Sequence, residues 1–166
     1  MDSNDLLLVI LTPDSVREGI TEALTNDLVG LLEAKVIHSQ TIKLSKQDVI
    51  NLYARLVNKW FFRAMVHNLT QGSSLLLVLR GDDLFSKIKD VKGTFRFESN
   101  KLIVTGLRSK YINKYNPSDL RRSGIKGNKL FYRMFEYRMH ATDSQEQTML
   151  QLNQLLNIDG ATFLSE

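Results

Sequence analysis

Hydrophobic and polar residues follow two different periods along the first half of this chain. Leu6–Leu11 is a continuous apolar run that ends in a Thr-Pro-Asp turn, which predicts a buried strand. Apolar residues at helical spacing then predict an amphipathic helix over about 19–34, and alternating residues predict a second strand over 35–44. A capping-box pattern predicts a helix over about 45–55, followed by an apolar helix over 59–69.

The second half of the chain continues the alternation of strands and helices. The expected segments are a strand at 74–79, a helix at 82–91, a hairpin at 94–104, a basic loop at 108–129, a strand at 130–139 and a helix at 143–156. This order favours an α+β sandwich with its sheet covered on one face, and it leaves the strand order open. A length of 166 residues predicts one domain spanning residues 1–166.

Composition narrows the environment of the protein. The sequence contains no cysteine, which excludes disulfides, thiolate metal sites and a cysteine nucleophile. The first apolar run, Leu6–Leu11, is too short for the core of a signal peptide or for a membrane span. We therefore expect a soluble cytoplasmic protein without a membrane segment.

Positive charge is concentrated in the last third of the chain. Nine basic residues lie between Arg108 and Arg138, and only Asp119 and Glu136 oppose them. This segment carries a net charge of +7. The whole chain carries +4, so the other residues together carry −3. Such a segment attracts phosphates, nucleic acid or an acidic protein surface, and a solvated loop with surplus lysines explains it equally well.

His140 is the candidate centre of chemistry. It follows the strand predicted at 130–139, and it precedes Thr142, Asp143 and Ser144, which are strong helix-cap residues. Backbone N–H groups at such a helix start can hold an anion beside a nucleophilic imidazole. The alternative is a structural histidine at the end of a strand, which is also the interpretation given to His38 and His67.

Five segments occur in an order that identifies a family. They are Leu8-Val9-Ile10-Leu11-Thr12-Pro13-Asp14-Ser15-Val16-Arg17-Glu18-Gly19, Tyr53-Ala54-Arg55-Leu56-Val57-Asn58-Lys59-Trp60-Phe61-Phe62, Ser73 through Gly81, Asn116-Pro117-Ser118-Asp119 with Gly124-Ile125-Lys126-Gly127, and His140-Ala141-Thr142-Asp143-Ser144. Together they cover about residues 6–156 and resemble the nucleoside diphosphate kinase family. The resemblance implies a ferredoxin-like βαββαβ sandwich with a four-stranded antiparallel sheet. It also implies that His140 is the nucleophile that takes the γ-phosphoryl group of a nucleoside triphosphate, with Mg²⁺ carried by the nucleotide.

Several positions that serve the phosphates in the family differ here. Thr12 stands where the family has a phosphate-binding lysine, and Lys126 where it has an arginine. Tyr137 replaces an asparagine and Tyr115 a threonine, while Gln151 replaces the glutamate that orients the histidine. These changes remove charge and bidentate hydrogen bonding from the expected site.

Other site positions persist. Tyr53 matches the tyrosine near the nucleophile, and Phe61 and Met65 match the apolar pair on which the base stacks. Either Arg108 or Lys89 matches the remaining arginine, because an insertion of about twenty residues lies at about 90–115.

Three functions follow from these residues. The first is a nucleotide-binding or assembly module with weak or absent turnover. The second is an active kinase that draws replacement cations from its basic segment, at Arg121, Arg122, Lys129 or Arg138. The third is binding of nucleic acid or an acidic surface by residues 108–138. The resemblance also implies nucleotides as ligands and a homo-oligomer or a larger protein assembly.

Overall fold

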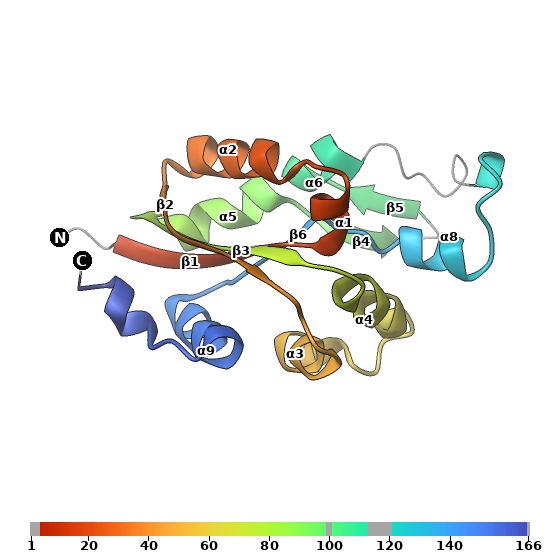
Figure 1. The fold of residues 1–166 in the computed structure, drawn as a ribbon. Coiled ribbons are helices and arrows are strands. Elements are labelled where there is room, and N and C mark those ends of the chain that lie inside the picture. The colour runs from red at the N-terminus through yellow and green to blue at the C-terminus, as the bar shows by residue number, and fades with distance from the viewer. Residues whose placement is uncertain (1–3, 99–100, 113–120, 166) are drawn as a thin grey trace.

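The fold is built on one antiparallel sheet with the strand order β2-β3-β1-β6. The computed structural model describes residues 4–98, 101–112 and 121–165 (Figure 1). The strands are β1 (Asn4–Leu11), β2 (Lys35–Ile42), β3 (Ser74–Asp82), β4 (Phe95–Glu98), β5 (Lys101–Val104) and β6 (Met139–Ala141). The α-helices are α1 (Pro13–Arg17), α2 (Thr21–Leu32), α3 (Lys46–Leu52), α4 (Phe62–Thr70), α5 (Leu84–Lys92), α6 (Gly106–Ile112), α8 (Asn128–Arg133) and α9 (Gln145–Leu156). This arrangement is the predicted ferredoxin-like α+β fold.

Helices cover both faces of the sheet, so the expectation of one covered face is wrong. Figure 1 shows α2, α5 and α6 above the sheet and α3, α4 and α9 below it. Leu7, Val9 and Leu11 of β1 pack with α2 and α5, while their even-numbered neighbours pack against Leu152 of α9. Because β1 is apolar on both faces, each face must be removed from water by its own layer.

Polar side chains determine where two helices begin. The predicted capping box at the start of α3 is confirmed: the Asp48 amide donates to Ser45 Oγ at 3.1 Å, and the Ser45 amide donates to Asp48 Oδ2 at 2.7 Å. At the start of α9, the Gln147 amide donates to Ser144 Oγ at 3.1 Å. This second cap places the start of α9 five residues after His140.

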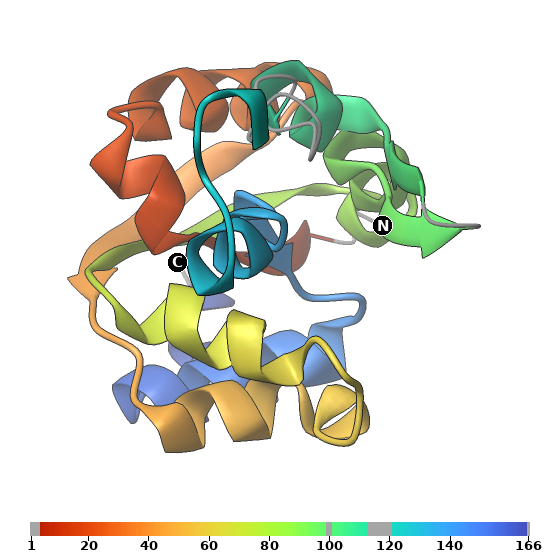
Figure 2. The ribbon, with the colours of Figure 1, turned by 90° about the vertical axis from the view of Figure 1, so that its right-hand side faces the viewer.

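The predicted strand at 130–139 is mostly wrong. Residues 128–133 form α8, which lies beside α4 at one end of the sheet (Figure 2), and only residues 139–141 join the sheet. Leu130 of α8 is buried, and Asn68 of α4 donates to the Tyr132 carbonyl at 2.7 Å, so contacts with α4 favour a helix here over a strand.

The predicted loop at 108–129 contains more structure than expected. Residues 106–112 form α6, and a helical turn occupies residues 121 and 122. The proposed Tyr115 and Asn116-Pro117 positions lie outside the described residues. The predicted hairpin at 94–104 is confirmed as β4 and β5.

Arg138 fixes the entry to β6 from the inside of the molecule. Its side chain is fully buried, and it forms ion pairs with Asp14 at 3.2 Å and Glu18 at 2.7 Å. Its carbonyl oxygen accepts hydrogen bonds from the Thr12 amide at 3.0 Å and from Ser15 Oγ at 2.8 Å. The backbone of Arg138 is left-handed, with φ of 74°, a conformation that disfavours residues with a Cβ and therefore depends on these contacts.

Arg138→Met is expected to lower the free energy of unfolding by about 3–5 kcal/mol, because it leaves Asp14 buried without its cation. Urea unfolding at pH 7 measures the change. Lys87→Met is the control, because the ion pair of Lys87 with Glu33 is solvent-exposed and is expected to contribute less than about 1 kcal/mol. Equal effects of the two substitutions would contradict a structural role for the buried pair.

Candidate active site around His140

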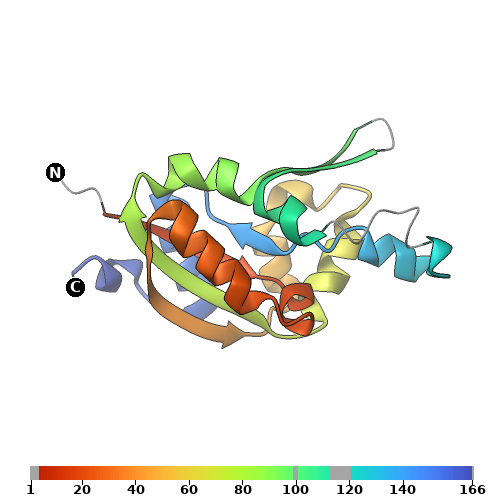
Figure 3. The same ribbon diagram turned by 90° about the horizontal axis from the view of Figure 1, so that it is seen from above.

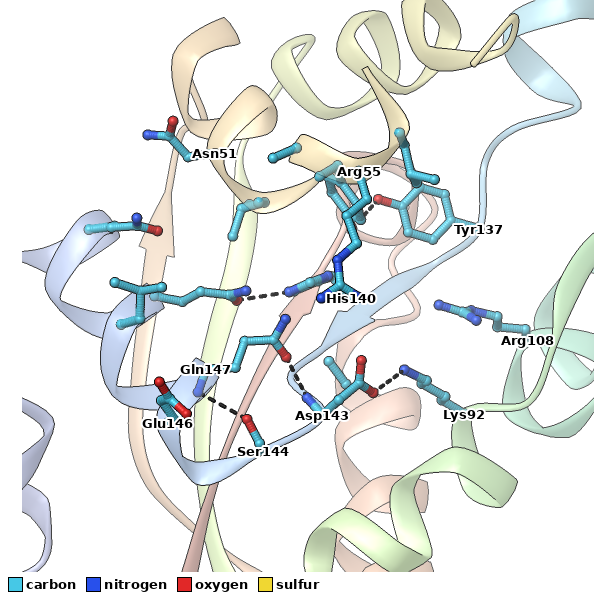
Figure 4. A pocket seen from close by; sticks show the side chains of 18 residues that line it. Asn51, Arg55, Lys92, Arg108, Tyr137, His140, Asp143, Ser144, Glu146 and Gln147 are labelled. Atoms are coloured by element: carbon cyan, nitrogen blue, oxygen red, sulfur yellow. Dashed lines mark hydrogen bonds and ion pairs between the residues drawn. The ribbon is translucent and has the colours of Figure 1, made fainter. Parts of the chain in front are cut away.

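His140 lies on the last strand of the sheet, opposite Ile10 of β1. It is 8% exposed, and its Nε2 lies 2.9 Å from Gln151 Oε1 on α9 (Figure 4). An amide oxygen can only accept, so Nε2 carries the proton and the lone pair is on Nδ1. The ring of Tyr53 meets the imidazole edge-on, with 5.1 Å between centroids. The histidine is therefore held in one orientation and one tautomer.

The surroundings of His140 keep the imidazole neutral. Burial lowers the pKa of His140 to about 4, the hydrogen bond to Gln151 opposes this shift, and the positive charges of Lys92 and Arg108 add to it. At neutral pH the ring is therefore uncharged, which is the form that can act as a nucleophile.

Two tyrosines form a wall next to the imidazole. The hydroxyl groups of Tyr53 and Tyr137 lie 2.6 Å apart. Burial raises the pKa of Tyr53 to about 12 and holds the pKa of Tyr137 well above its ordinary value. Both phenols therefore stay protonated and present neutral hydroxyl groups beside His140.

Two of the cations near His140, Arg108 and Lys92, are already engaged by protein groups. Arg108 donates to the carbonyl oxygens of Gly93 at 3.0 Å and Met139 at 2.9 Å. Lys92 pairs with Asp143 at 3.4 Å (Figure 4). Burial lowers the pKa of both Lys92 and Arg108. Each cation must exchange a protein partner for a phosphate oxygen if it is to bind one.

Two neighbouring cavities share one wall. The first, of about 650 Å³, is lined by His140 and by the cationic side chains of Arg55, Lys92 and Arg108. The second, of about 420 Å³, is an apolar slot between the α3–α4 connection and the β4–β5 hairpin. Its aromatic and aliphatic lining residues are Leu56, Trp60, Phe61, Met65, Phe95 and Phe135. Tyr53, Tyr137 and Arg108 line both cavities.

Most of the predicted site residues come together around these cavities. His140, Tyr53, Tyr137 and Arg108 line the first, and Phe61 and Met65 line the second. They originate from five different elements or connections, so the fold rather than local sequence brings them into contact. Between the two residues proposed for the family arginine, Arg108 reaches the cavities and Lys89 lines neither.

Two predicted residues lie apart from His140. The Thr12 hydroxyl donates to Asp14 Oδ1 at 2.5 Å inside the buried cluster with Arg138, and Thr12 lines neither cavity. Burial raises the pKa of Asp14, while Thr12 and Arg138 oppose that increase. Lys126 also lines neither cavity. Their proposed contacts with phosphate therefore stay predictions.

Apart from Arg108, the basic residues of this segment that the structure describes do not gather at His140. Arg138 is buried with its two carboxylates, and Lys110 pairs with Asp27 at 2.7 Å. Lys129 lines a separate cavity beside α8 that also contains Arg17. The cations expected to replace the family's clamp are therefore dispersed over the molecule.

The sequence missed three residues beside His140. Arg55 and Lys92 line its cavity, as does Asp143, the partner of Lys92. Asp143 was visible in the His-Ala-Thr-Asp-Ser motif, but only as a helix cap. Lys92 gives no local signal, because it is one of several lysines at the end of α5.

The family model described as nucleoside diphosphate kinase matches residues 6–159. This chain belongs to the nucleoside diphosphate kinase family. It is similar to the family's enzyme from Hydrogenovibrio crunogenus, with 33% identity over 87 residues, or 51% of this chain and 59% of that protein. The match to the enzyme of Campylobacter hominis likewise spans only 62% of that relative's length. A longer match, to the Acetivibrio thermocellus enzyme, has 25% identity over 149 residues and covers 87% and 90% of the two chains.

Solved structures of the family share the fold of this chain. The nucleoside diphosphate kinase of Aquifex aeolicus superposes with a TM-score of 0.63 and 16% identity, over 96% of this chain and 98% of that one. The NDP kinase of Pyrobaculum aerophilum gives a TM-score of 0.62 and 16% identity, over 90% and 94%. The architecture is retained although five in six aligned residues differ.

Two classes of feature are absent from the part of the chain that the structure describes. None of its helices combines the length and apolarity that crossing a membrane requires. No cluster of three or more histidine or acidic side chains there could hold a metal ion.

His140 makes folding depend on pH in a defined direction. The unfolded imidazole takes up a proton near its ordinary pKa of 6.5, whereas the folded one does so only near pH 4. Its contribution is therefore complete above pH 6.5 and is lost as the pH falls toward 4, by on the order of 3 kcal/mol. Urea unfolding at pH 7 and pH 4 should show a larger decrease for the wild type than for His140→Gln. Asp14 and Glu136 titrate in both proteins, so equal decreases would contradict a buried neutral His140.

Proposed function

We propose that this member of the family binds nucleoside di- or triphosphates beside His140 and transfers phosphoryl groups weakly or not at all. The observation that carries the proposal is the partner of His140. A neutral amide, Gln151, occupies the position of the carboxylate expected from the family resemblance.

Phosphoryl transfer explains why that partner matters. His140 Nδ1 would attack the γ-phosphorus, a P–N bond would form, and the bond to the β-phosphate oxygen would break as the nucleoside diphosphate leaves. The imidazole keeps its proton on Nε2, so the phosphorylated ring carries a positive charge. A carboxylate would stabilise that charge, whereas the oxygen of Gln151 offers only a dipole.

The phosphate end of the site is weakened as well. Loose phosphoryl-transfer transition states depend mainly on cations that hold the phosphate oxygens. Thr12 supplies a hydroxyl that already bonds Asp14, and Arg108 already donates to two backbone carbonyls. Mg²⁺ would enter with the nucleotide as part of the substrate.

An active kinase is the second candidate function. The neutral imidazole with its lone pair on Nδ1 favours it, and so do the cations Arg55 and Lys92 in the same cavity. Release of Lys92 from its ion pair with Asp143 would place one positive charge on the phosphates.

Assembly is a further part of the proposal. The family resemblance supports a cytoplasmic homo-oligomer or a place in a larger protein complex. Leu31 is 57% exposed and Val36, on the edge strand β2, is 39% exposed, so a partner surface could cover both.

Incubation with γ-labelled ATP and Mg²⁺ is expected to label the wild type slowly with an acid-labile, base-stable phosphate, and to leave His140→Gln unlabelled. Gln151→Glu is expected to raise the labelling rate roughly tenfold, because a charged partner stabilises the phosphorylated ring more than an amide does.

Gln154→Glu is the matched control for this substitution. It adds the same charge to α9 at an exposed position that lines the cavity without bonding His140. If Gln154→Glu accelerates labelling as much as Gln151→Glu, the effect is one of net charge. Rapid stoichiometric labelling of the wild type would replace the proposal of weak turnover with the active kinase.

Nucleotide binding is testable without turnover. A nucleoside diphosphate with Mg²⁺ at a hundred times its dissociation constant should stabilise the protein by about 2.7 kcal/mol and raise the melting temperature by several degrees. Differential scanning fluorimetry across a concentration series measures this shift. A melting temperature that no nucleotide changes would contradict nucleotide binding.

A further inference from the structure

The inserted β4–β5 hairpin forms the outer wall of the apolar slot. Figure 3 shows the hairpin extending outward from the end of α5. The Phe95 ring on β4 lies 6.2 Å from that of Tyr137 and 6.5 Å from that of Phe135, measured between centroids. Phe95 and Arg96 both line the slot. The insertion therefore contributes side chains to a cavity that the rest of the fold leaves open on this side.

Contacts at its base hold the hairpin in place. Gly93 has φ of 77°, and any side chain there would collide with the backbone of Thr105. The Thr94 amide donates to Thr105 Oγ1 at 2.8 Å. Arg108 joins the Gly93 carbonyl to the carbonyl of Met139, the residue before His140. Phe95 and Arg96 thus have a defined position relative to the nucleophile.

The slot has the chemistry of a site for a flat, apolar ring. Aromatic side chains dominate its lining, and a volume of about 420 Å³ lies within the range of small-molecule sites. Trp60 is 64% exposed at its edge, next to Phe61 and Phe135 at centroid distances of 5.6 and 5.5 Å. Stacking of a base on such rings is favourable and is itself tolerant of base identity.

Arg96 brings a charged side chain to this slot. It and Arg108 are the only charged residues that line the slot in the part of the chain that the structure describes, and Arg108 is bonded to two carbonyls. The partner of Arg96 is Glu98 at 3.0 Å, and their side chains are 58% and 53% exposed. Such an exposed pair is weak and exchanges readily. A guanidinium supplies donors alone, so it fits a base edge that carries acceptors alone.

We infer that the hairpin makes the slot selective for guanine nucleotides, with Phe95 packing on the base and Arg96 donating to its O6 and N7 acceptors. Adenine places an amino donor where guanine has O6, so it offers Arg96 only one acceptor. This inference rests on the proposed nucleotide binding. In this inference the hairpin selects the base, and the His140 cavity binds the phosphates.

Trp60 is the single tryptophan of the chain, so its emission reports occupation of the slot. Titration of the full chain with GDP, ADP, CDP or inorganic pyrophosphate, each with Mg²⁺, should change Trp60 emission for the nucleoside diphosphates and not for pyrophosphate. GDP is expected to bind roughly tenfold more tightly than ADP, as one bidentate arginine contact allows.

Substitutions on the hairpin separate the packing of Phe95 on the base from the hydrogen bonds of Arg96 to the base. Arg96→Ala should abolish the preference for GDP over ADP. Phe95→Ala should weaken the binding of GDP and of ADP by roughly fivefold each and retain the preference. Glu98→Gln, on the same hairpin, is the matched control: it removes the partner of Arg96 and should leave the preference intact.

The outcomes distinguish this inference from the proposed function. Equal affinity of the wild type for GDP and ADP, or a preference that survives Arg96→Ala, overturns the role of the hairpin and leaves nucleotide binding standing. Nucleotides that raise the melting temperature without changing Trp60 emission overturn the slot as the base site. Nucleotides that change neither quantity overturn both the inference and the proposed function.

Discussion

The buried ion pair between Arg138 and Asp14 is the interaction on which the rest of the site depends. It joins the start of β6 to α1, two segments more than a hundred residues apart in the chain. A buried charge without its partner is strongly unfavourable, so neither side chain can leave the interior alone. The pair therefore holds Arg138 in a left-handed backbone and fixes the direction in which the chain enters the strand that carries His140.

The same ion pair keeps polar side chains away from the cavity of His140. Arg138 and Thr12 both serve the buried cluster with Asp14, so neither faces the cavity of His140. The imidazole is buried, neutral and held by an uncharged amide of Gln151. Such a histidine keeps the orientation of a nucleophile, but its direct hydrogen-bond partner carries no charge that would stabilise a phosphorylated ring. The proposed function, nucleotide binding with weak or absent phosphoryl transfer, rests on this combination of a retained fold and an uncharged partner.

The β4–β5 hairpin adds side chains next to the cavity of His140. Arg108 links its base to the backbone next to His140, and Phe95 extends the aromatic wall that begins with Tyr137. Cavity and slot therefore adjoin at Tyr53, Tyr137 and Arg108, and the exposed Trp60 lines the slot. A segment predicted to be an insertion becomes part of the proposed ligand site because the fold places it against the α3–α4 connection.

Sequence periodicity determined most of the fold, because apolar runs and caps act locally. The run Leu6–Leu11 and the cap at Ser45 were predictable, and ordered motifs identified the family and His140. Tertiary structure alone decided that α8 replaces a predicted strand and that both faces of the sheet are covered. It also decided that Arg138 is a buried partner of a carboxylate rather than a free cation. A sequence shows which residues are basic but not where their side chains lie. Only packing determines whether a basic side chain contacts a ligand, a carboxylate or water.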